Sequence, residues 1–311
     1  MQSNSAKEKD RKMNITITGS LGHISKPLTQ HLVKEGHSVT VISSNPEKQE
    51  EITAIGAIPA IGSLENVDFI TSSFTNADVV YCMIPPANYF DHTLDLTAYY
   101  LRLGRNYVEA IKQSAVKRVI NLSTIGGHLS QGNGILKGAH YVENLLNELP
   151  SDVSITHIRP TEFYYNLLPQ VHSAKINGFI ASNIGNEVVN SWVSPVDIAR
   201  AIAEEITTSF DGRKVRYVAS EELTYNELAA TLGKAIGNPD LKWLSITDEQ
   251  MKDGLVSVGM NPGIAAGLTE MYAAINSGLL YEDYNLHKPT NYGKIKMKDF
   301  ANDFALAYNK L

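Results

Sequence analysis

Residues 14–25 read NITITGSLGHIS, a short β-rich run that leads into two glycines and then into a helical pattern. Gly19 permits a tight turn, and Gly22 lets the backbone come close to a bound group because it has no Cβ atom. The amides from Ser20 to Ile24 then lie at the N-terminus of a helix. The dipole of that helix favours an anion there. The stretch predicts a turn that binds the pyrophosphate of a dinucleotide; the alternative is an ordinary strand-to-helix turn.

Beyond this turn, short apolar runs alternate with longer helical patterns, which is typical of βαβ units and a parallel sheet. Strands are predicted at residues 14–18, 38–42, near 58, at 78–83, 118–123 and 154–160. Helices are predicted at residues 24–34, from Pro46 after an Asn45 cap, and at 93–113. The strands are continuously apolar, so both faces of the sheet should be covered. The predicted class is α/β, a doubly wound parallel (Rossmann) sheet with right-handed crossovers.

The pattern becomes less regular after Arg159, and this change suggests a second lobe. Helices are expected from residue 194, at 225–236 and at 263–276, with short strands at 215–219 and 242–246. We therefore expect a disordered polar leader over residues 1–12, an NAD(P)-binding Rossmann domain over 13–160, and a smaller C-terminal α+β substrate lobe over 161–311.

Composition narrows the class of protein. The 311 residues carry a formal net charge of −6, which disfavours a nucleic-acid binder. The one cysteine, Cys82, excludes an intrachain disulfide and a cysteine metal cluster and is read as a small buried hydrophobe. The sequence has neither a secretory signal nor an apolar run of membrane-spanning length. These features favour a cytoplasmic protein that binds a small-molecule substrate, not a membrane.

The choice between NADP and NAD should be made at the end of the second strand. Ser43, Ser44, Asn45 and Lys48 stand there, and the only acid is Glu47. Hydroxyls and an ammonium can hold a 2′-phosphate, which a carboxylate would repel. The sequence thus favours NADP, with NAD as the alternative, although the same serines and Asn45 also suit a simple helix cap.

In the order and spacing of its motifs, the chain resembles the NmrA-like branch of the atypical short-chain dehydrogenases. The glycine turn, ISSNPEK, KRVINLSTIGG, ITHIRPTEFYYNLL, VSPVDIARAIAEE and ELTYNELAATLGKAIG carry this resemblance, which extends over residues 14–311. Ser44 stands where many members of the family place an arginine against the 2′-phosphate, a departure that weakens the expectation of NADP. The cofactor-binding positions implied by the resemblance are Gly19, Leu21, Gly22, His23, Ile24, Ile84, Pro85, Ser123, Thr124, Pro160 and Phe163.

The catalytic pair of the standard short-chain dehydrogenases, a tyrosine four residues before a lysine, is missing from the expected helix. Tyr141 has Leu145 at the lysine position. The spacing recurs at Tyr284 with Lys288 and at Tyr292 with Lys296, far downstream, where we interpret it as coincidence.

Three nearby polar residues, Lys137, His140 and Tyr141, are the candidates for catalysis, against the alternative of a solvated helix start. His128 could line the same cleft, although a lone histidine is more often structural. The sequence holds no metal-ligand motif, and hydride transfer needs none because the nicotinamide carries the chemistry.

Two functions follow as hypotheses. The first is an NAD(P)H-dependent oxidoreductase acting on a quinone or small carbonyl compound, with solvent or a weak acid completing protonation. The second is a non-catalytic NADP-responsive redox sensor that recognises a regulatory protein partner. An isomerase or epimerase is disfavoured because those chemistries usually use the missing pair. A homodimer is possible through the Tyr- and Leu-rich helix.

Overall fold

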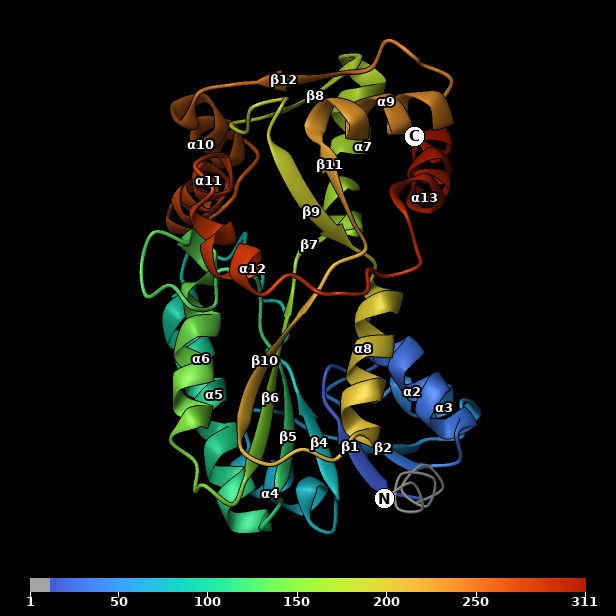
Figure 1. Cartoon of the computed structure of the whole chain (residues 1–311), viewed down its shortest axis with the longest axis vertical. Helices are drawn as coiled ribbons and strands as arrows, with labels where there is room; N and C mark the ends of the chain where they lie inside the picture. Colours follow the sequence, from blue (N-terminus) through green and yellow to red (C-terminus); the bar gives the residue numbers. More distant parts are fainter. Residues whose placement is uncertain (1–11) are drawn as a thin grey trace.

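The computed structural model describes residues 12–311, and its largest element is a seven-stranded parallel sheet (Figure 1). The strands lie in the order β10-β6-β5-β4-β1-β2-β3. Their bounds are β1 (Asn14–Ile17), β2 (Ser38–Ser43), β3 (Ile58–Ile61), β4 (Val79–Cys82), β5 (Arg118–Leu122), β6 (Ser154–Pro160) and β10 (Arg213–Val218). The six strands predicted before residue 161 are all present, and the predicted α/β class with a doubly wound sheet is confirmed.

Helices cover both faces of this sheet because its strands are apolar on both sides. In β4, Val79 and Tyr81 pack into the core on one face, whereas Val80 and Cys82 pack into the core on the other. The first face is covered by α2 (Ser25–Lys34), α3 (Lys48–Ala54) and α8 (Pro195–Thr207), and the second by α4 (Val67–Phe74), α5 (Leu96–Ser114) and α6 (Lys137–Asn147) (Figure 1). Cys82 is fully buried, in line with its interpretation as a core hydrophobe.

Two helices start later than predicted, one at a side-chain cap and one after a side-chain-stabilised turn. The Asp95 carboxylate accepts a hydrogen bond from the Ala98 amide at 2.9 Å, so α5 begins at Leu96 and not at residue 93. The Asn45 side chain accepts from the Glu47 amide at 2.9 Å and holds a turn through Pro46, and α3 begins only at Lys48.

The chain returns to the large sheet after it has begun the second lobe. The strand expected at residues 215–219 is β10, which pairs in parallel with β6 and forms the edge of the large sheet. Helix α8 leads into it and packs beside α2. Residues 195–218 therefore belong structurally with the sheet, while the division of the chain at residue 160 stays a prediction.

The remaining elements form a smaller α+β lobe, drawn at the top of Figure 1, as predicted. Its strands are β7 (Glu162–Phe163), β9 (Val189–Val193) and β11 (Glu221–Thr224) in one sheet, and β8 (Phe179–Ser182) and β12 (Lys242–Ser245) in another. Its α-helices are α7 (Gln170–Ile176), α9 (Tyr225–Ala235), α10 (Asp248–Ser257), α11 (Pro262–Asn276), α12 (Glu282–Leu286) and α13 (Met297–Lys310). Three 3₁₀ turns complete the described chain: η1 (Gly134–Leu136), η2 (Tyr164–Leu167) and η3 (Leu279–Tyr281).

Aromatic side chains fill the core of this lobe. Trp192 is fully buried and stacks on Tyr164 at a centroid distance of 6.4 Å, and Tyr225 packs edge-on against its other side. Phe304 of α13 is also fully buried, and Phe300 of the same helix stacks on Tyr164 at a centroid distance of 5.8 Å, so the C-terminal helix packs on the lobe through its aromatic face.

The leader expected over residues 1–12 lies outside the described residues except for Lys12, whose ammonium donates to the Glu35 carbonyl at 2.6 Å. Between residues 12 and 311, we find no helix with the length and hydropathy needed to cross a membrane.

Removing the Phe304 ring should destabilise the protein because it leaves a cavity under α13. We expect Phe304→Ala to lower the free energy of unfolding by about 3–5 kcal/mol, measured by urea denaturation. Leu306→Ala on the same helix is the control: its side chain is 60% exposed, so a change within about 0.5 kcal/mol is expected. Equal effects of the two substitutions would show that α13 is not docked in this way.

Candidate functional site

The glycine turn lies where the strand order of the large sheet reverses. β1 pairs with β2 on one side and with β4 on the other, and a parallel sheet opens a crevice at the carboxyl ends of strands at such a point. Gly19 has a φ of +87°, which the chain needs in order to turn between β1 and α2. The Ser25 hydroxyl donates to the Thr18 carbonyl at 3.0 Å and fixes the first turn of α2 against the strand.

Fewer amides of this turn are free than the sequence predicts. The Ser20 amide donates to the Ile42 carbonyl at 3.0 Å, and the Gly22 amide donates to the Gly19 carbonyl at 3.2 Å. The amides of His23 and Ile24, two residues that line the cavity, have no such partner within residues 12–311. An anion at this turn would thus meet those two amides and the N-terminus of α2.

The space around the two glycines fits a dinucleotide. A Cβ atom added to Gly19 would come within 2.8 Å of the Met83 sulfur and 2.9 Å of the Ser25 hydroxyl. A Cβ atom added to Gly22 would approach the Gly19 carbonyl at 3.2 Å, at the rim of the cavity. Only glycine leaves both the turn and the approach to it open.

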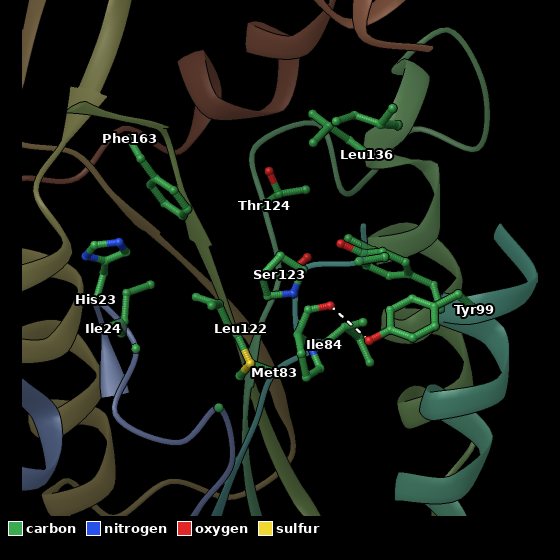
Figure 2. Close-up of a pocket in the computed structure, with 18 of the residues that line it drawn as sticks. His23, Ile24, Met83, Ile84, Tyr99, Leu122, Ser123, Thr124, Leu136 and Phe163 are labelled. Atoms are coloured by element: carbon green, nitrogen blue, oxygen red, sulfur yellow. Dashed lines mark hydrogen bonds between the residues drawn. The ribbon is translucent and has the colours of Figure 1, made fainter. Parts of the chain in front are cut away.

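A single cavity of about 1060 Å³ extends from this turn to the second lobe. Its volume exceeds the ~300–1,000 Å³ usual for one small-molecule site. Figure 2 shows His23 and Ile24 on one side and Tyr99 on the other, with Met83 and Ser123 between them. The predicted positions that line it are Gly19, Ser20, Gly22, His23, Ile24, Ser43, Ser44, Ile84, Pro85, Ser123, Thr124 and Phe163, whereas Leu21, Asn45, Lys48 and Pro160 do not line it.

The end of β2 presents hydroxyls, as predicted, while its nearest lysine is engaged elsewhere. Ser20 donates to the Ser43 hydroxyl at 2.9 Å, and Ser44 is exposed beside it. Lys48 pairs with Glu51 at 2.8 Å, and Lys26 pairs with the other oxygen of the same carboxylate at 2.8 Å. These two ammonium groups lower the pKa of Glu51 to about 2. A 2′-phosphate would therefore compete with Glu51 for both lysines.

The loop after β4 is fixed in position by three hydrogen bonds to side chains. The Thr18 hydroxyl accepts from the Met83 amide at 2.9 Å, and Tyr107 donates to the Met83 carbonyl at 2.6 Å. Tyr99 donates to the Pro85 carbonyl at 3.1 Å, the dashed contact in Figure 2. The loop can thus present a fixed wall to a ligand.

Ser123, at the end of β5, belongs to a buried charged network. Its hydroxyl donates to Glu143, which also accepts from Arg159 at 2.9 and 2.6 Å. The Arg159 guanidinium also pairs with Asp283 of α12 at 2.9 Å. Burial alone would lower the pKa of Arg159, but its hydrogen bonds to the Glu143 carboxylate raise it overall. Because the Ser123 proton is committed to Glu143, its oxygen can only accept a hydrogen bond from a ligand.

The three catalytic candidates do not line the cavity. His140 makes a 2.9 Å hydrogen bond between its Nδ1 atom and the Gly127 carbonyl, and the Lys137 ammonium lies 5.7 Å from the Tyr141 ring centroid. Their neighbours Leu136 and Ala139 do line it. A catalytic role for Lys137, His140 and Tyr141 therefore stays a prediction.

The other polar groups considered for catalysis also lie outside the cavity wall. His128 is partly buried, its ring nitrogens have no hydrogen-bond partner within residues 12–311, and burial lowers its pKa. Tyr284 makes a 3.0 Å hydrogen bond with Ser191, and Lys288 pairs with Glu222 at 2.7 Å. No group of three or more potential metal ligands occurs within residues 12–311.

The sequence suggests only part of the wall that the second lobe contributes: the apolar stretch from Phe163 to Leu168 is expected to cover a substrate cleft, and Phe163 and Tyr165 of that stretch line the cavity. That wall is largely apolar and aromatic, and it comprises Tyr165, Leu268, Met271, Tyr272, Ile275, Leu280 and Tyr281, with one acid, Glu162. The ring of Tyr165 stacks on His23 of the glycine turn at 4.6 Å and joins the two lobes at the mouth of the cleft. Leu268, Met271, Tyr272 and Ile275 follow ordinary helical spacing along α11, which carries no signal of a ligand site in the sequence.

Comparison with known proteins identifies the class. Residues 19–209 match the family described as NAD(P)H-binding, and the chain belongs to this family. The NAD(P)-binding class implied by the resemblance to the NmrA-like atypical short-chain dehydrogenases is thereby confirmed, as is the expectation of a nicotinamide dinucleotide as cofactor.

Individual relatives are more distant. The chain is 23% identical over 260 residues to an NAD(P)H azoreductase of Xenophilus azovorans, covering 83% of this chain and 86% of the relative. The same fold occurs in a Citrobacter triphenylmethane reductase complexed with NADP(H), at 19% identity and a TM-score of 0.73, covering 94% and 99% of the two chains. It also occurs in an Escherichia coli NADPH-dependent quinone oxidoreductase complexed with NADPH, at 20% identity and a TM-score of 0.77, covering 93% and 99%.

A side chain at Gly22 should block the dinucleotide by occupying the space next to the turn. We expect Gly22→Val to weaken NADPH binding at least tenfold in a fluorescence titration. Gly254→Val on α10 is the matched control, because an added Cβ atom there meets nothing within 4 Å; it should bind NADPH like the wild type. Unchanged affinity of Gly22→Val would place the pyrophosphate elsewhere.

Proposed function

We propose that this protein is an NAD(P)H-dependent oxidoreductase that reduces a quinone or another small carbonyl compound. The observation that carries the proposal is the continuous cavity, whose glycine-turn half suits a dinucleotide and whose second half is apolar. A volume of about 1060 Å³ leaves room for an acceptor beside the cofactor. The azoreductase and quinone oxidoreductase named above are consistent with it, because both act with a nicotinamide nucleotide.

The chain's own residues would bind and orient both partners. His23 and Ile24 would hold the pyrophosphate, Ser43 and Ser44 the adenosine ribose, and Ser123 would accept a hydrogen bond at the nicotinamide end. When bound, the reduced nicotinamide supplies a hydride. The apolar wall around Met271 would exclude water from the acceptor. A homodimer or a regulatory protein partner stays a prediction.

A redox sensor would use the first half of the cavity alone, whereas the second half has the character of a substrate pocket. Turnover separates the two functions. We expect NADPH oxidation at 340 nm to depend on added quinones or aromatic aldehydes, followed with a panel of such acceptors. Binding of NADPH without oxidation by any acceptor would contradict the proposal and favour the sensor.

A charge in the apolar wall should weaken binding of the acceptor and leave binding of the cofactor unchanged. We expect Met271→Lys to raise the KM for the best quinone at least tenfold, because the acceptor would have to displace a hydrated ammonium group. The Kd for NADPH should stay within twofold. Leu306→Lys, at an exposed position of α13, is the matched control and should leave both constants unchanged.

Cofactor preference offers an independent test at Ser44. The side chain is exposed at the end of β2, where a guanidinium would meet a 2′-phosphate. We expect Ser44→Arg to tighten NADPH binding about tenfold, the effect of one charge-assisted hydrogen bond of about 1.5 kcal/mol. NADH, which lacks that phosphate, should bind as before. An equal gain for both nucleotides would show that the arginine acts elsewhere.

A further inference from the structure

Glu162 is an acidic side chain in the apolar half of the cavity. It lies in β7, directly after the loop that leaves β6, and it shares the cavity with Ser123 and Tyr281. β7 pairs with β9, with Glu162 opposite Trp192. The carboxyl is thus carried by a strand whose position is fixed by the core of the second lobe.

The two oxygens of this carboxyl differ in their surroundings. Oε2 accepts a hydrogen bond from the Asn190 amide at 2.6 Å and a longer one from the Tyr225 hydroxyl at 3.3 Å. Oε1 receives none from any residue between 12 and 311. Because Oε2 is already occupied by two donors, a proton on Glu162 resides on Oε1, the oxygen left free for a ligand.

No cation neutralises this carboxyl within the described part of the chain, since Glu162 forms no salt bridge there. Burial raises its pKa to about 7, and the hydrogen bonds from Asn190 and Tyr225 only partly oppose that shift. A partly buried acid without a counter-ion takes up a proton more readily than an exposed one because its charged form is poorly solvated.

The titratable groups that face Glu162 are three tyrosines. Tyr225 lies on α9, Tyr272 on α11 and Tyr281 in η3, and burial raises the pKa of each phenol well above its usual range. All three stay neutral across the physiological range. Tyr281 also donates to Asn190, which orients the amide that holds Oε2. Glu162 is therefore the group in this half of the cavity that exchanges a proton near pH 7.

We infer that Glu162 is the proton donor of this site, delivering a proton from Oε1 to the carbonyl oxygen of the acceptor. The inference rests on the proposed function. Hydride transfer from the reduced nicotinamide nucleotide gives the acceptor two electrons and one hydrogen, and it leaves a negative charge on oxygen. The O–H bond of Glu162 breaks, a new O–H bond forms on the acceptor, and the carboxylate then regains a proton from water.

The first experiment follows the carboxyl without cofactor. In pH-difference infrared spectra of the full-length protein, the wild type should lose a protonated-carboxyl band with a midpoint near pH 7. The band should be absent in Glu162→Gln, which keeps the shape and hydrogen bonding of the side chain. It should persist in Glu187→Gln, a control that alters an exposed carboxylate of the same lobe. A wild-type spectrum without such a band would overturn the inference.

The second experiment measures quinone reduction by NADPH. We expect the wild-type kcat to fall above pH 7, and we expect Glu162→Gln to abolish that fall and to lower kcat about 100-fold, within the range found for general acids. NADPH affinity, measured separately, should not change. Glu162→Asp keeps an ionisable carboxyl and should recover part of the rate, whereas a merely structural role would make it no better than Glu162→Gln.

The outcomes separate this inference from the function on which it rests. A wild type that reduces quinones, with Glu162→Gln equally fast and equally pH-dependent, would overturn the role of Glu162 and leave the oxidoreductase intact. A wild type that binds NADPH but reduces no acceptor would overturn the proposed function and the proton donor with it. If Glu162→Gln does not fold, the Glu162→Asp rate and pH profile decide between proton donor and structural residue.

Discussion

The site depends on one backbone constraint, the turn at Gly19 between β1 and α2. Gly19 leaves the strand with a positive φ of 87°. The side chains of Met83 and Ser25 lie so close that a Cβ atom at this position would clash with them. No side chain fits there, so the turn stays bare and the N-terminus of α2 points into the crevice between β1 and β4. The proposed position of the pyrophosphate, at the amides of His23 and Ile24, depends on that geometry.

The second constraint is that the cavity needs both lobes. One wall comes from the carboxyl ends of the large sheet and the other from α11, η2 and η3 of the smaller lobe. The lobes are joined by the ion pair between Arg159 and Asp283 and by the return of the chain through α8 and β10. Breaking either partner of that buried pair would leave a charge without compensation, which is costly in a protein interior.

Two carboxyl groups near the cavity, the buried Glu143 and the partly buried Glu162, lie in opposite electrostatic surroundings. Glu143 is paired with the Arg159 guanidinium and accepts the hydrogen bond from the Ser123 hydroxyl, so both of its oxygens are engaged in orienting these two side chains. Glu162 has only neutral donors around it, and burial favours its protonated form. Because their surroundings differ, the two carboxyl groups suit different roles. Glu143 positions Ser123, whereas Glu162 suits proton exchange.

The sequence by itself determined the large sheet and the turn. Continuous apolar runs in β1, β2, β4, β5 and β6 carry the signal of strands buried on both faces, and Gly19 with Gly22 marks the turn because backbone conformation is a local property. The tertiary structure alone decided where residues 213–218 pair, since a short strand on a sheet edge has the same local pattern in either lobe. It alone also decided the substrate wall and Glu162, because Asn190, Tyr225 and Tyr281 lie 28 or more residues from Glu162 along the chain and meet it only through packing. The partial burial of Glu162 and the lack of a cation beside it within residues 12–311 raise its pKa, and both are properties of the assembled core that no local sequence pattern encodes.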